Sequence, residues 1–454
     1  MHQRIFRRIS CKGRVEEMNV AVEHMDSVAD IAMRARKSSR ILAKLPTEAR
    51  NTILLNTAGC IEEQVQEILA ANALDCEKAQ VEVEEGRMAS SLFDRLQTSE
   101  KGVADMAAKV RAVASLPDPI GRTLAVSELD NDLMLHKVTC PLGVIGVIFE
   151  SRPDVVPQVG ALCLKSGNSV LLKGGREAAN TNKVLAGIWI RILTKFDEKL
   201  SGSVNLLHTR EDVAEMLKLD GLIDLIVPRG SKEFVNYIAM HSSIPVLGHG
   251  EGICHVYVDV AADLDKAMKI VLDAKTNYPA ACNAAETLLV HHGIASRFVP
   301  QIVEKLKAAG VEVRGCARTR ELAQSASVIE ATESDWRTEY SDLIISVKVV
   351  DDVGEAIAHI EQYGSQHTEA IVTEDQATAA EFMESIDAAG VYLNASTRFA
   401  DGFRYGFGAE VGISTSKLHA RGPVGLDGLT TYKYKLYGDG HTVANFRGKQ
   451  APIE

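Results

Sequence analysis

The chain has 454 residues, of which 46% are hydrophobic and 24% charged; this exceeds what one hydrophobic core usually holds and predicts two or three domains. Its net charge of −11 at pH 7 argues against a general nucleic-acid or anionic-membrane surface. No apolar stretch reaches the roughly 20 residues that span a bilayer. The eight cysteines form no CxxC pair and no short Cys/His spacing, a pattern that gives no metal signature and is typical of a reducing, cytoplasmic compartment.

The N-terminal quarter of the sequence predicts a helical layer. Its first residues are rich in arginine but lack an apolar core, so we interpret residues 1–17 as an extension, with Met18 as an alternative start. Helices are expected over residues 21–45 and 47–74, and in the second of these the apolar residues keep to one helical face. Pro117 and Pro119 end this layer, which we expect to cover a sheet.

A β-hairpin is predicted next, near residues 121–140. Short apolar alternation flanks Asp130, Asn131 and Asp132, a cluster that favours a turn. The apolar face of this hairpin has no obvious partner nearby in the chain. We therefore expect it to dock on another subunit, so that the protein forms a homo-oligomer.

The rest of the chain alternates strands and helices, which predicts parallel sheets with crossover helices on their faces. In the first half, strands are expected at 143–149, 169–173, 204–207, 222–227 and 255–259, with helices at 155–164, 178–194 and 212–219. A helix at 263–275 leads to a second set of strands at 286–291, 343–350, 369–373 and 390–394, with helices at 295–309, 352–363 and 375–388 between them. We place a domain boundary near residue 276.

Two strand ends in the first half have residues that suit a phosphorylated ligand. Arg229, Gly230 and Ser231 lie where a strand gives way to a helix, whose first free N–H groups attract anions. Lys173, Gly174 and Arg176 follow another strand at its carboxyl end, where open α/β sheets bind ligands. Each segment alone could equally be an ordinary turn or a solvated charge pair. Together they favour a phosphorylated cofactor.

Cys282 is the most informative single residue. It lies in YPAACNAAET (residues 278–287), among small residues at the junction of the two halves. Most cysteines in folded proteins are buried structural thiols, and reactivity depends on a lowered pKa that no sequence shows. The local sequence therefore leaves both a structural and a catalytic thiol open.

Several blocks resemble the aldehyde dehydrogenase superfamily: PLGVIGVI (residues 141–148), the Lys173 strand end, the Gly230 turn, the helix start at residues 262–265, and Cys282. Within it, the γ-glutamyl phosphate reductase family is similar in four blocks: FESRPD (149–154), the Cys282 block, NASTRFADGFRYGFG (394–408) and LTTYKY (429–434). The likeness runs from about residue 20 to about residue 440. It favours Cys282 as a nucleophile.

The resemblance implies an enzyme that reduces γ-glutamyl phosphate to glutamate 5-semialdehyde in proline biosynthesis. Cys282 would displace phosphate to give a thioester, and hydride would then reduce it. We expect Cys282 and Asn283 to form the catalytic part of the site, with the Cys282 N–H as one oxyanion donor. The identity of the second oxyanion donor stays open. Hydrolytic relatives use an asparagine side chain, and the matching neighbourhood here is Ser151, Arg152 and Pro153.

A second difference from the hydrolytic relatives concerns the general base. Hydrolytic relatives carry a glutamate in a Glu-Leu-Gly-Gly segment, whereas the counterpart here is VLGHGEG (residues 246–252), with His249 and Glu251 near that place. A missing base would protect the thioester from water and favours reduction of an acyl phosphate. His249 could also be a loop histidine without a role.

The cofactor implied is NADPH. Where NAD-preferring relatives have an acidic residue three places after the strand-end lysine, this sequence has Arg176, which suits a 2′-phosphate. The cofactor-binding residues expected are Lys173, Gly174, Arg176, Arg229, Gly230, Ser231 and Glu339. Glu339 resembles the glutamate that holds the nicotinamide ribose, although it could also be a surface charge.

Substrate-binding residues are expected among guanidinium and hydroxyl groups that can match a carboxylate and a phosphoryl group, namely Arg152, Ser396, Thr397, Arg398 and Arg404. At least one of these arginines should make a structural ion pair instead. The domains implied are an NADPH-binding domain (18–120 and 141–275), a catalytic domain (276–426) and an oligomerisation element (121–140 and 427–454).

The chain has no room for a fused kinase, so a separate glutamate 5-kinase is implied as pathway partner. Two alternatives stay open: another aldehyde or acyl-phosphate oxidoreductase of the superfamily, or a non-catalytic homologue that retains the fold.

Overall fold

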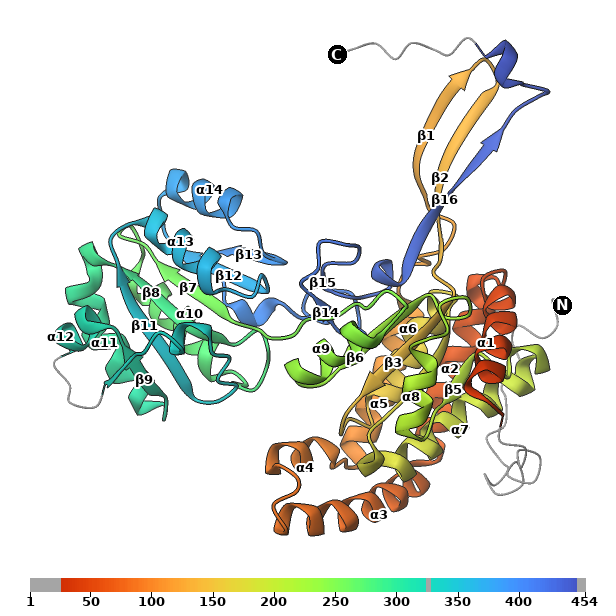
Figure 1. Ribbon diagram of the computed structural model, residues 1–454, viewed down its shortest axis with the longest axis horizontal. Coiled ribbons are helices and arrows are strands. Elements are labelled where there is room, and N and C mark those ends of the chain that lie inside the picture. Colours follow the sequence, from red (N-terminus) through yellow and green to blue (C-terminus); the bar gives the residue numbers. More distant parts are fainter. Residues whose placement is uncertain (1–25, 324–327, 447–454) are drawn as a thin grey trace.

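The computed structural model describes residues 26–323 and 328–446, which form two lobes and a projecting sheet (Figure 1). Each lobe is built on a parallel sheet with helices on both faces, so the predicted α/β fold class is confirmed. The expected extension at residues 1–17, and residues 18–25 of the expected first domain, lie outside the described part of the chain.

The N-terminal helices belong to the first lobe. They are α1 (Val28–Leu42), α2 (Thr47–Glu63), α3 (Val65–Glu84), α4 (Ser90–Leu96) and α5 (Glu100–Ser115). The helix expected over residues 47–74 is in fact divided at Gln64, whose φ of −108° and ψ of 23° leave the α-helical region. Apolar periodicity continues through such a break, which is why the sequence did not reveal it.

The first sheet has the order β5-β4-β3-β6, and all its strands are parallel. The strands are β3 (Val144–Phe149), β4 (Ser169–Lys173), β5 (Val204–Leu206) and β6 (Leu225–Arg229). Helices α6 (Val155–Lys165) and α7 (Ala179–Phe196) pack with α2 and α5 on one face, whereas α8 (Arg210–Met216) and α9 (Lys232–His241) pack with α1 on the other. Burial on both faces explains the nearly continuous apolar runs of these strands.

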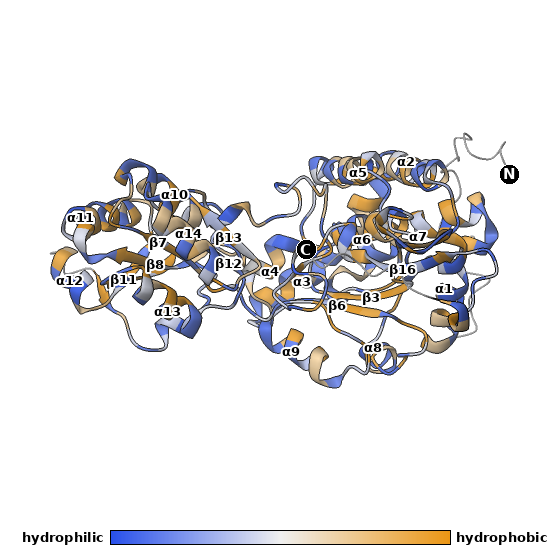
Figure 2. Ribbon diagram, turned by 90° about the horizontal axis from the view of Figure 1, so that it is seen from above, coloured by the Kyte–Doolittle hydropathy of each residue, from blue (hydrophilic) through white to orange (hydrophobic). Residues whose placement is uncertain are grey.

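The second sheet has the order β10-β9-β11-β8-β7-β12-β13, also parallel. Its strands are β7 (Cys254–Val258), β8 (Ala285–His291), β9 (Glu312–Gly315), β10 (Ile329–Glu330), β11 (Ile344–Val350), β12 (Thr368–Val372) and β13 (Gly390–Leu393). The helices around it are α10 (Leu264–Thr276), α11 (His292–Ala308), α12 (Ala317–Ala323), α13 (Val353–Tyr363) and α14 (Gln376–Ser385). Apolar residues gather in the strands of both sheets and on the helix faces turned toward them (Figure 2).

The domain boundary expected near residue 276 is wrong, because two elements that precede it belong to the second lobe. Strand β7 lies between β8 and β12 in the second sheet, and α10 packs on that sheet. The chain therefore passes between the lobes before β7, within residues 242–253. The sequence could not show this, since a buried parallel strand has the same apolar pattern in either sheet.

The C-terminal part of the expected catalytic domain also lies elsewhere. Ala409, Val411, Val424 and Leu426 are buried in the hydrophobic core of the first lobe. This segment contains the short strands β14 (Ile413–Ser414) and β15 (Gly422–Pro423), which pair with each other. The chain thus returns to the first lobe after β13, through the loop that contains Arg398 and Arg404.

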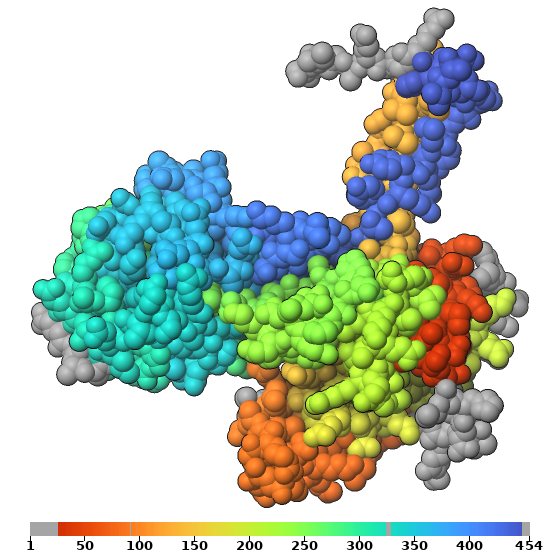
Figure 3. Space-filling model, viewed as in Figure 1, coloured from red at the N-terminus to blue at the C-terminus, as the bar shows by residue number. Residues whose placement is uncertain are grey.

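The projecting sheet combines the predicted hairpin with the C-terminal strand. Strands β1 (Thr123–Asp130), β2 (Leu133–Pro141) and β16 (Thr430–Tyr437) are antiparallel in the order β1-β2-β16. The space-filling view shows this sheet standing clear of both lobes (Figure 3). Its strands leave Tyr434 60% and Leu436 57% exposed. Among the described residues, no helix has the length and apolarity to cross a membrane.

Candidate active site

Cys282 lies in the loop that joins α10 to β8, and its side chain is half-buried. Tyr278, at the start of this loop, has a φ of 62°, in the left-handed region that a tyrosine rarely adopts. Gly252 packs directly on the Cys282 backbone, and a methyl group there would overlap the Cys282 carbonyl. The thiol is therefore held between its own loop and the segment that connects the lobes.

Asn283 joins the cysteine loop to the arginine-containing loop. Its side chain is 4% exposed, and its Nδ2 donates to the Ala400 carbonyl at 2.8 Å. A buried amide committed to a backbone carbonyl positions two loops. Asn283, which the sequence placed in the catalytic pair, thus links these loops through Nδ2, while its Oδ1 has no hydrogen-bond partner among the described residues.

Two guanidinium groups lie within electrostatic reach of the thiol, one from each lobe. Arg229 ends β6 of the first lobe, and its Nη1 is buried without a hydrogen-bond partner among the described residues. Burial, followed by repulsion from Arg152, lowers the pKa of Arg229 to about 10, while Glu410, Asp154 and Cys282 oppose the shift. The sequence placed Arg229 with the cofactor, and the structure places it within electrostatic reach of the thiol as well.

Arg398 supplies the second guanidinium. It is 7% exposed, and its Nε donates to the Asn277 carbonyl at 2.5 Å, which ties it to the cysteine loop. Burial and then the neighbouring Arg404 lower its pKa, whereas Cys282 raises it. A buried cation without a carboxylate in contact is suited to an anionic ligand.

The other expected substrate residues divide between structural and exposed positions. Arg404 donates from Nη1 to the Arg398 carbonyl at 2.8 Å and so shapes the loop, while Arg152 lies 3.6 Å from Asp154 through its Nε. Ser396 is buried, and its Oγ accepts from the Arg398 N–H at 3.3 Å. Thr397 is fully buried, and its Oγ1 has no hydrogen-bond partner among the described residues.

The expected cofactor residues gather at the carboxyl end of the first sheet. Lys173, 8% exposed, ends β4 and donates from Nζ to the Gly174 carbonyl at 2.6 Å. Ser231 caps α9 by accepting the Phe234 N–H at 3.3 Å. Beside Gly230, Glu150 follows β3 and accepts the Ser231 N–H; burial and then Glu177 raise the pKa of Glu150.

Arg176 is an exposed member of the cofactor candidates. Its side chain is 78% exposed and lies 3.3 Å from Glu82 through its Nη2. Such an exposed pair contributes little to stability, so the guanidinium remains available to a ligand.

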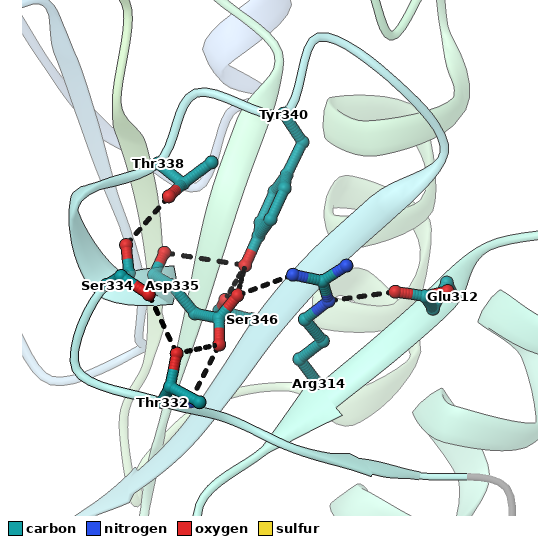
Figure 4. Close-up of polar contacts among 8 residues, drawn as sticks. All are labelled: Glu312, Arg314, Thr332, Ser334, Asp335, Thr338, Tyr340 and Ser346. Atoms are coloured by element: carbon teal, nitrogen blue, oxygen red, sulfur yellow. Dashed lines mark hydrogen bonds and ion pairs between the residues drawn. The ribbon is translucent and has the colours of Figure 1, made fainter.

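The loop that contains Glu339 is fixed by a polar network (Figure 4). Tyr340 donates from Oη to Asp335 at 2.9 Å, and Arg314 donates to the same carboxylate at 2.6 Å. Burial would raise the pKa of Asp335, but hydrogen bonds from Thr332 and Arg314 prevail and lower it to about 2. The network holds Glu339 near His249, where the carboxylate accepts the Gly252 N–H.

Comparisons with known proteins identify the family of the chain. The sequence pattern of the aldehyde dehydrogenase family matches residues 12–319. A γ-glutamyl phosphate reductase from Synechococcus sp. (strain JA-3-3Ab) is 55% identical over 417 residues, which cover 92% of this chain and 91% of that protein. The chain belongs to the aldehyde dehydrogenase family, in its γ-glutamyl phosphate reductase branch.

Solved structures extend the similarity to the fold. The crystal structure of γ-glutamyl phosphate reductase from Thermotoga maritima matches with a TM-score of 0.88 and 43% identity, and covers 92% of this chain and 100% of that chain. A glyceraldehyde-3-phosphate dehydrogenase from Methanocaldococcus jannaschii, solved with NADP, matches with a TM-score of 0.64 at 18% identity over 91% of this chain and 94% of that one, which shows the shared fold alone. The aldehyde dehydrogenase family uses a nicotinamide dinucleotide.

Within this family, the segment at residues 246–252 departs from the hydrolytic members in a way that the structure explains. Glu251 lies 2.6 Å from Lys232 through its carboxylate, and His249 donates from Nδ1 to the Ile413 carbonyl at 2.9 Å. Glu251 thus forms an ion pair with Lys232, whose side chain is 46% exposed.

Three residues near the site had no role in the sequence interpretation. Glu150 could have been found, since it directly follows a strand at the sheet edge where ligands bind. His367 and Glu410 had no local signal, because only the tertiary fold brings them to the cysteine and arginine loops.

Proposed function

We propose that this protein reduces γ-glutamyl phosphate to glutamate 5-semialdehyde and phosphate with NADPH, the reductive step of proline biosynthesis. The observation that carries the proposal is the half-buried Cys282 thiol within electrostatic reach of two guanidinium groups, Arg229 and Arg398. The substrate has a phosphoryl group at its reacting end and a carboxylate at the other. Two cations beside one nucleophile match both charges.

The residues at the carboxyl end of the first sheet fit a dinucleotide. Lys173 and the N-terminus of α9 would hold its ribose and phosphates, Arg176 a 2′-phosphate, and Glu339 the second ribose. When bound, NADPH supplies hydride to the acyl group on Cys282. The Glu150 carboxylate, which accepts the Ser231 N–H, must yield that N–H when a phosphate binds there.

The first step belongs to Cys282. Its thiolate attacks the γ-acyl carbon, the carbon–oxygen bond to phosphate breaks, and phosphate leaves with the electron pair, so that a thioester remains. After reduction, the thiohemiacetal oxygen forms the aldehyde carbonyl, and the carbon–sulfur bond breaks to restore the thiolate. Phosphate is a good leaving group, so this step needs no strong general acid.

Arg229 fills the place left open for a second oxyanion donor. Its unpartnered Nη1 can donate to the developing oxyanion or to the departing phosphate, together with the Cys282 N–H. The ion pair of Glu251 with Lys232 keeps that carboxylate from activating water, which preserves the thioester until it is reduced.

The reverse reaction gives a direct test. Purified protein should reduce NADP⁺ with pyrroline-5-carboxylate, which equilibrates with glutamate 5-semialdehyde, only when inorganic phosphate is present. Simple aldehydes should react poorly under the same conditions. Phosphate-independent turnover would indicate a hydrolytic dehydrogenase, and no turnover with bound cofactor would indicate a non-catalytic homologue.

Arg176→Asp should weaken the preference of the enzyme for NADPH over NADH. A hydrogen bond between charged groups contributes about 1.5–3 kcal/mol, so the KM for NADPH should rise by about 10-fold to 100-fold while that for NADH changes little. Steady-state kinetics with both cofactors measures the ratio. Arg297→Asp, on an exposed position of α11 in the other lobe, is the control. An unchanged ratio in Arg176→Asp would remove this residue from the cofactor site.

Two partners complete the proposal. The acyl phosphate must come from a kinase that acts on glutamate, so a separate glutamate 5-kinase is the pathway partner. The projecting β1-β2-β16 sheet, with exposed Tyr432, Tyr434 and Leu436, is the element by which subunits join into a homo-oligomer.

A further inference from the structure

A group of three potential metal ligands lies at the nucleophile itself. One nitrogen of His249, one nitrogen of His367 and the Cys282 sulfur all lie within 4.8 Å of one another. The two imidazole rings are 5.2 Å apart between centroids and meet edge to face. The three residues come from separate parts of the chain: the connection between the lobes, the loop before β12, and the cysteine loop.

In both histidines the polar contacts are made by Nδ1, which leaves Nε2 for a ligand. The Nδ1 of His249 faces the Ile413 carbonyl, which can only accept, so in the neutral ring the lone pair is on Nε2. The Nδ1 of His367 lies 2.9 Å from the Thr368 hydroxyl oxygen and 3.7 Å from the Cys254 sulfur. In the tautomer in which this Nδ1 donates to the hydroxyl oxygen, the lone pair of His367 is also on Nε2. His367 is 1% exposed, and its Nε2 has no hydrogen-bond partner among the described residues.

A buried nitrogen without a partner is destabilising, and a bound cation would relieve that cost. Around Zn²⁺, with bonds of about 2.0–2.3 Å, tetrahedral ligand atoms lie roughly 3.4–3.6 Å apart. The three donor atoms would therefore have to approach one another by at most roughly 1.5 Å. A thiolate and two imidazoles select Zn²⁺ or Co²⁺ over Mg²⁺ or Ca²⁺, which prefer oxygen.

We propose that His249, His367 and Cys282 form a binding site for a thiophilic divalent cation such as Zn²⁺, and that its occupation reversibly inactivates the nucleophile. The cation binds the Cys282 sulfur as the thiol proton leaves, and both Nε2 lone pairs complete a three-residue site with one open position. The sulfur electron pair needed for attack on an acyl carbon is then held by the metal. Binding itself needs neither substrate nor NADPH, so it can be measured apart from the function proposed above.

Cobalt titration of the full chain tests the site. Under anaerobic conditions, with the thiols reduced, Co²⁺ should bind with a stoichiometry of about one and produce a thiolate-to-cobalt charge-transfer band in the near ultraviolet. Zn²⁺ should displace it, whereas excess Mg²⁺ should not. In the enzyme assay, Zn²⁺ should inhibit and a chelator should restore activity.

Substitutions then assign the ligands. Cys282→Ser should abolish the charge-transfer band. His249→Ala and His367→Gln should each weaken Co²⁺ binding by at least about 100-fold, since even the partners of ligands are worth 10-fold to 100-fold. His292→Ala, an exposed histidine at the start of α11, should leave the spectrum unchanged. Thermal melting confirms that each variant is folded.

The proposal fails if Co²⁺ binds without a thiolate band. It also fails if folded His249→Ala and His367→Gln both bind Co²⁺ as tightly as the parent chain. Because His249 is on a half-buried loop and His367 is in the core, loss of fold in the second variant would leave the first to decide the result.

Discussion

Cys282→Ala is expected to lower kcat by at least about 10⁴-fold, because removal of a covalent nucleophile leaves only binding and electrostatic stabilisation. The substituted side chain is small and half-buried, so the melting temperature and the affinity for NADPH should change little. Phosphate-dependent NADP⁺ reduction measures the first effect, and thermal melting with and without cofactor measures the second.

Cys316→Ala provides the matched control. Cys316 is also a free, half-buried thiol, but it lies before α12 in the second lobe, with its sulfur 3.3 Å from Thr319 Oγ1. This variant should keep full turnover. Retained activity in Cys282→Ala, or labelling by iodoacetamide that spares Cys282 while other cysteines react, would show that the nucleophile has been misassigned.

At a pH above about 8, where Glu286 is ionised, Lys275→Met is expected to cost about 3–5 kcal/mol of the free energy of unfolding, since it leaves a buried carboxylate without its cation. Lys275 is 0% and Glu286 1% exposed, and Nζ lies 2.6 Å from the Glu286 Oε2. The other carboxylate oxygen accepts the Ser341 N–H at 3.3 Å. The pair thus joins the two ends of the cysteine loop and the loop that contains Glu339. Urea unfolding measures the loss.

Two variants separate the buried pair from charge in general. The double variant Lys275→Met/Glu286→Leu should recover most of the loss, because it removes both buried charges. Lys266→Met, on the same helix α10, breaks the exposed pair with Glu374 and should cost less than about 1 kcal/mol. Equal losses in Lys266→Met and Lys275→Met would contradict the importance of burial.

The same pair predicts a dependence of stability on pH. Burial raises the pKa of Glu286 to about 7, against the opposing effect of Lys275. The native carboxyl group therefore keeps its proton between the ordinary pKa near 4.5 and about 7, while the unfolded chain loses it. Over this range the free energy of unfolding should fall as pH rises, and Glu286→Gln should remove this part of the slope.

The sequence was most informative about features that depend on short contiguous segments. The Cys282 loop, the Lys173 strand end and the α9 N-terminus could be predicted because each is one turn of chain with characteristic residues. The hairpin at residues 121–140 was also predicted, since alternation and a turn cluster are local properties. The resemblance already grouped that hairpin with the C-terminal segment, and the structure adds the antiparallel pairing of β2 with β16.

Features that depend on the tertiary fold could not be predicted in the same way. Strand β7 looked like the last strand of the first sheet, because burial on both faces gives the same apolar run in either lobe. Arg229 was assigned to the cofactor from its place beside Gly230, but it also lies within electrostatic reach of the thiol of the other lobe. His367 is distant from Cys282 in the sequence. It lies near the thiol only because β8, β7 and β12 are neighbours in the second sheet.

The two connections between the lobes also supply residues near the thiol: one contains His249 and Gly252, and the other contains Arg398. A protein joined at two points can turn about the line between them and resists other displacements. Rotation of the lobes about this line would move Arg229 away from Cys282. The same motion would therefore admit substrate when it opens the site and bring the reacting groups together when it closes the site. Substitutions that stiffen either segment should therefore alter kcat and KM together, and solvent viscosity should slow turnover if opening limits the rate.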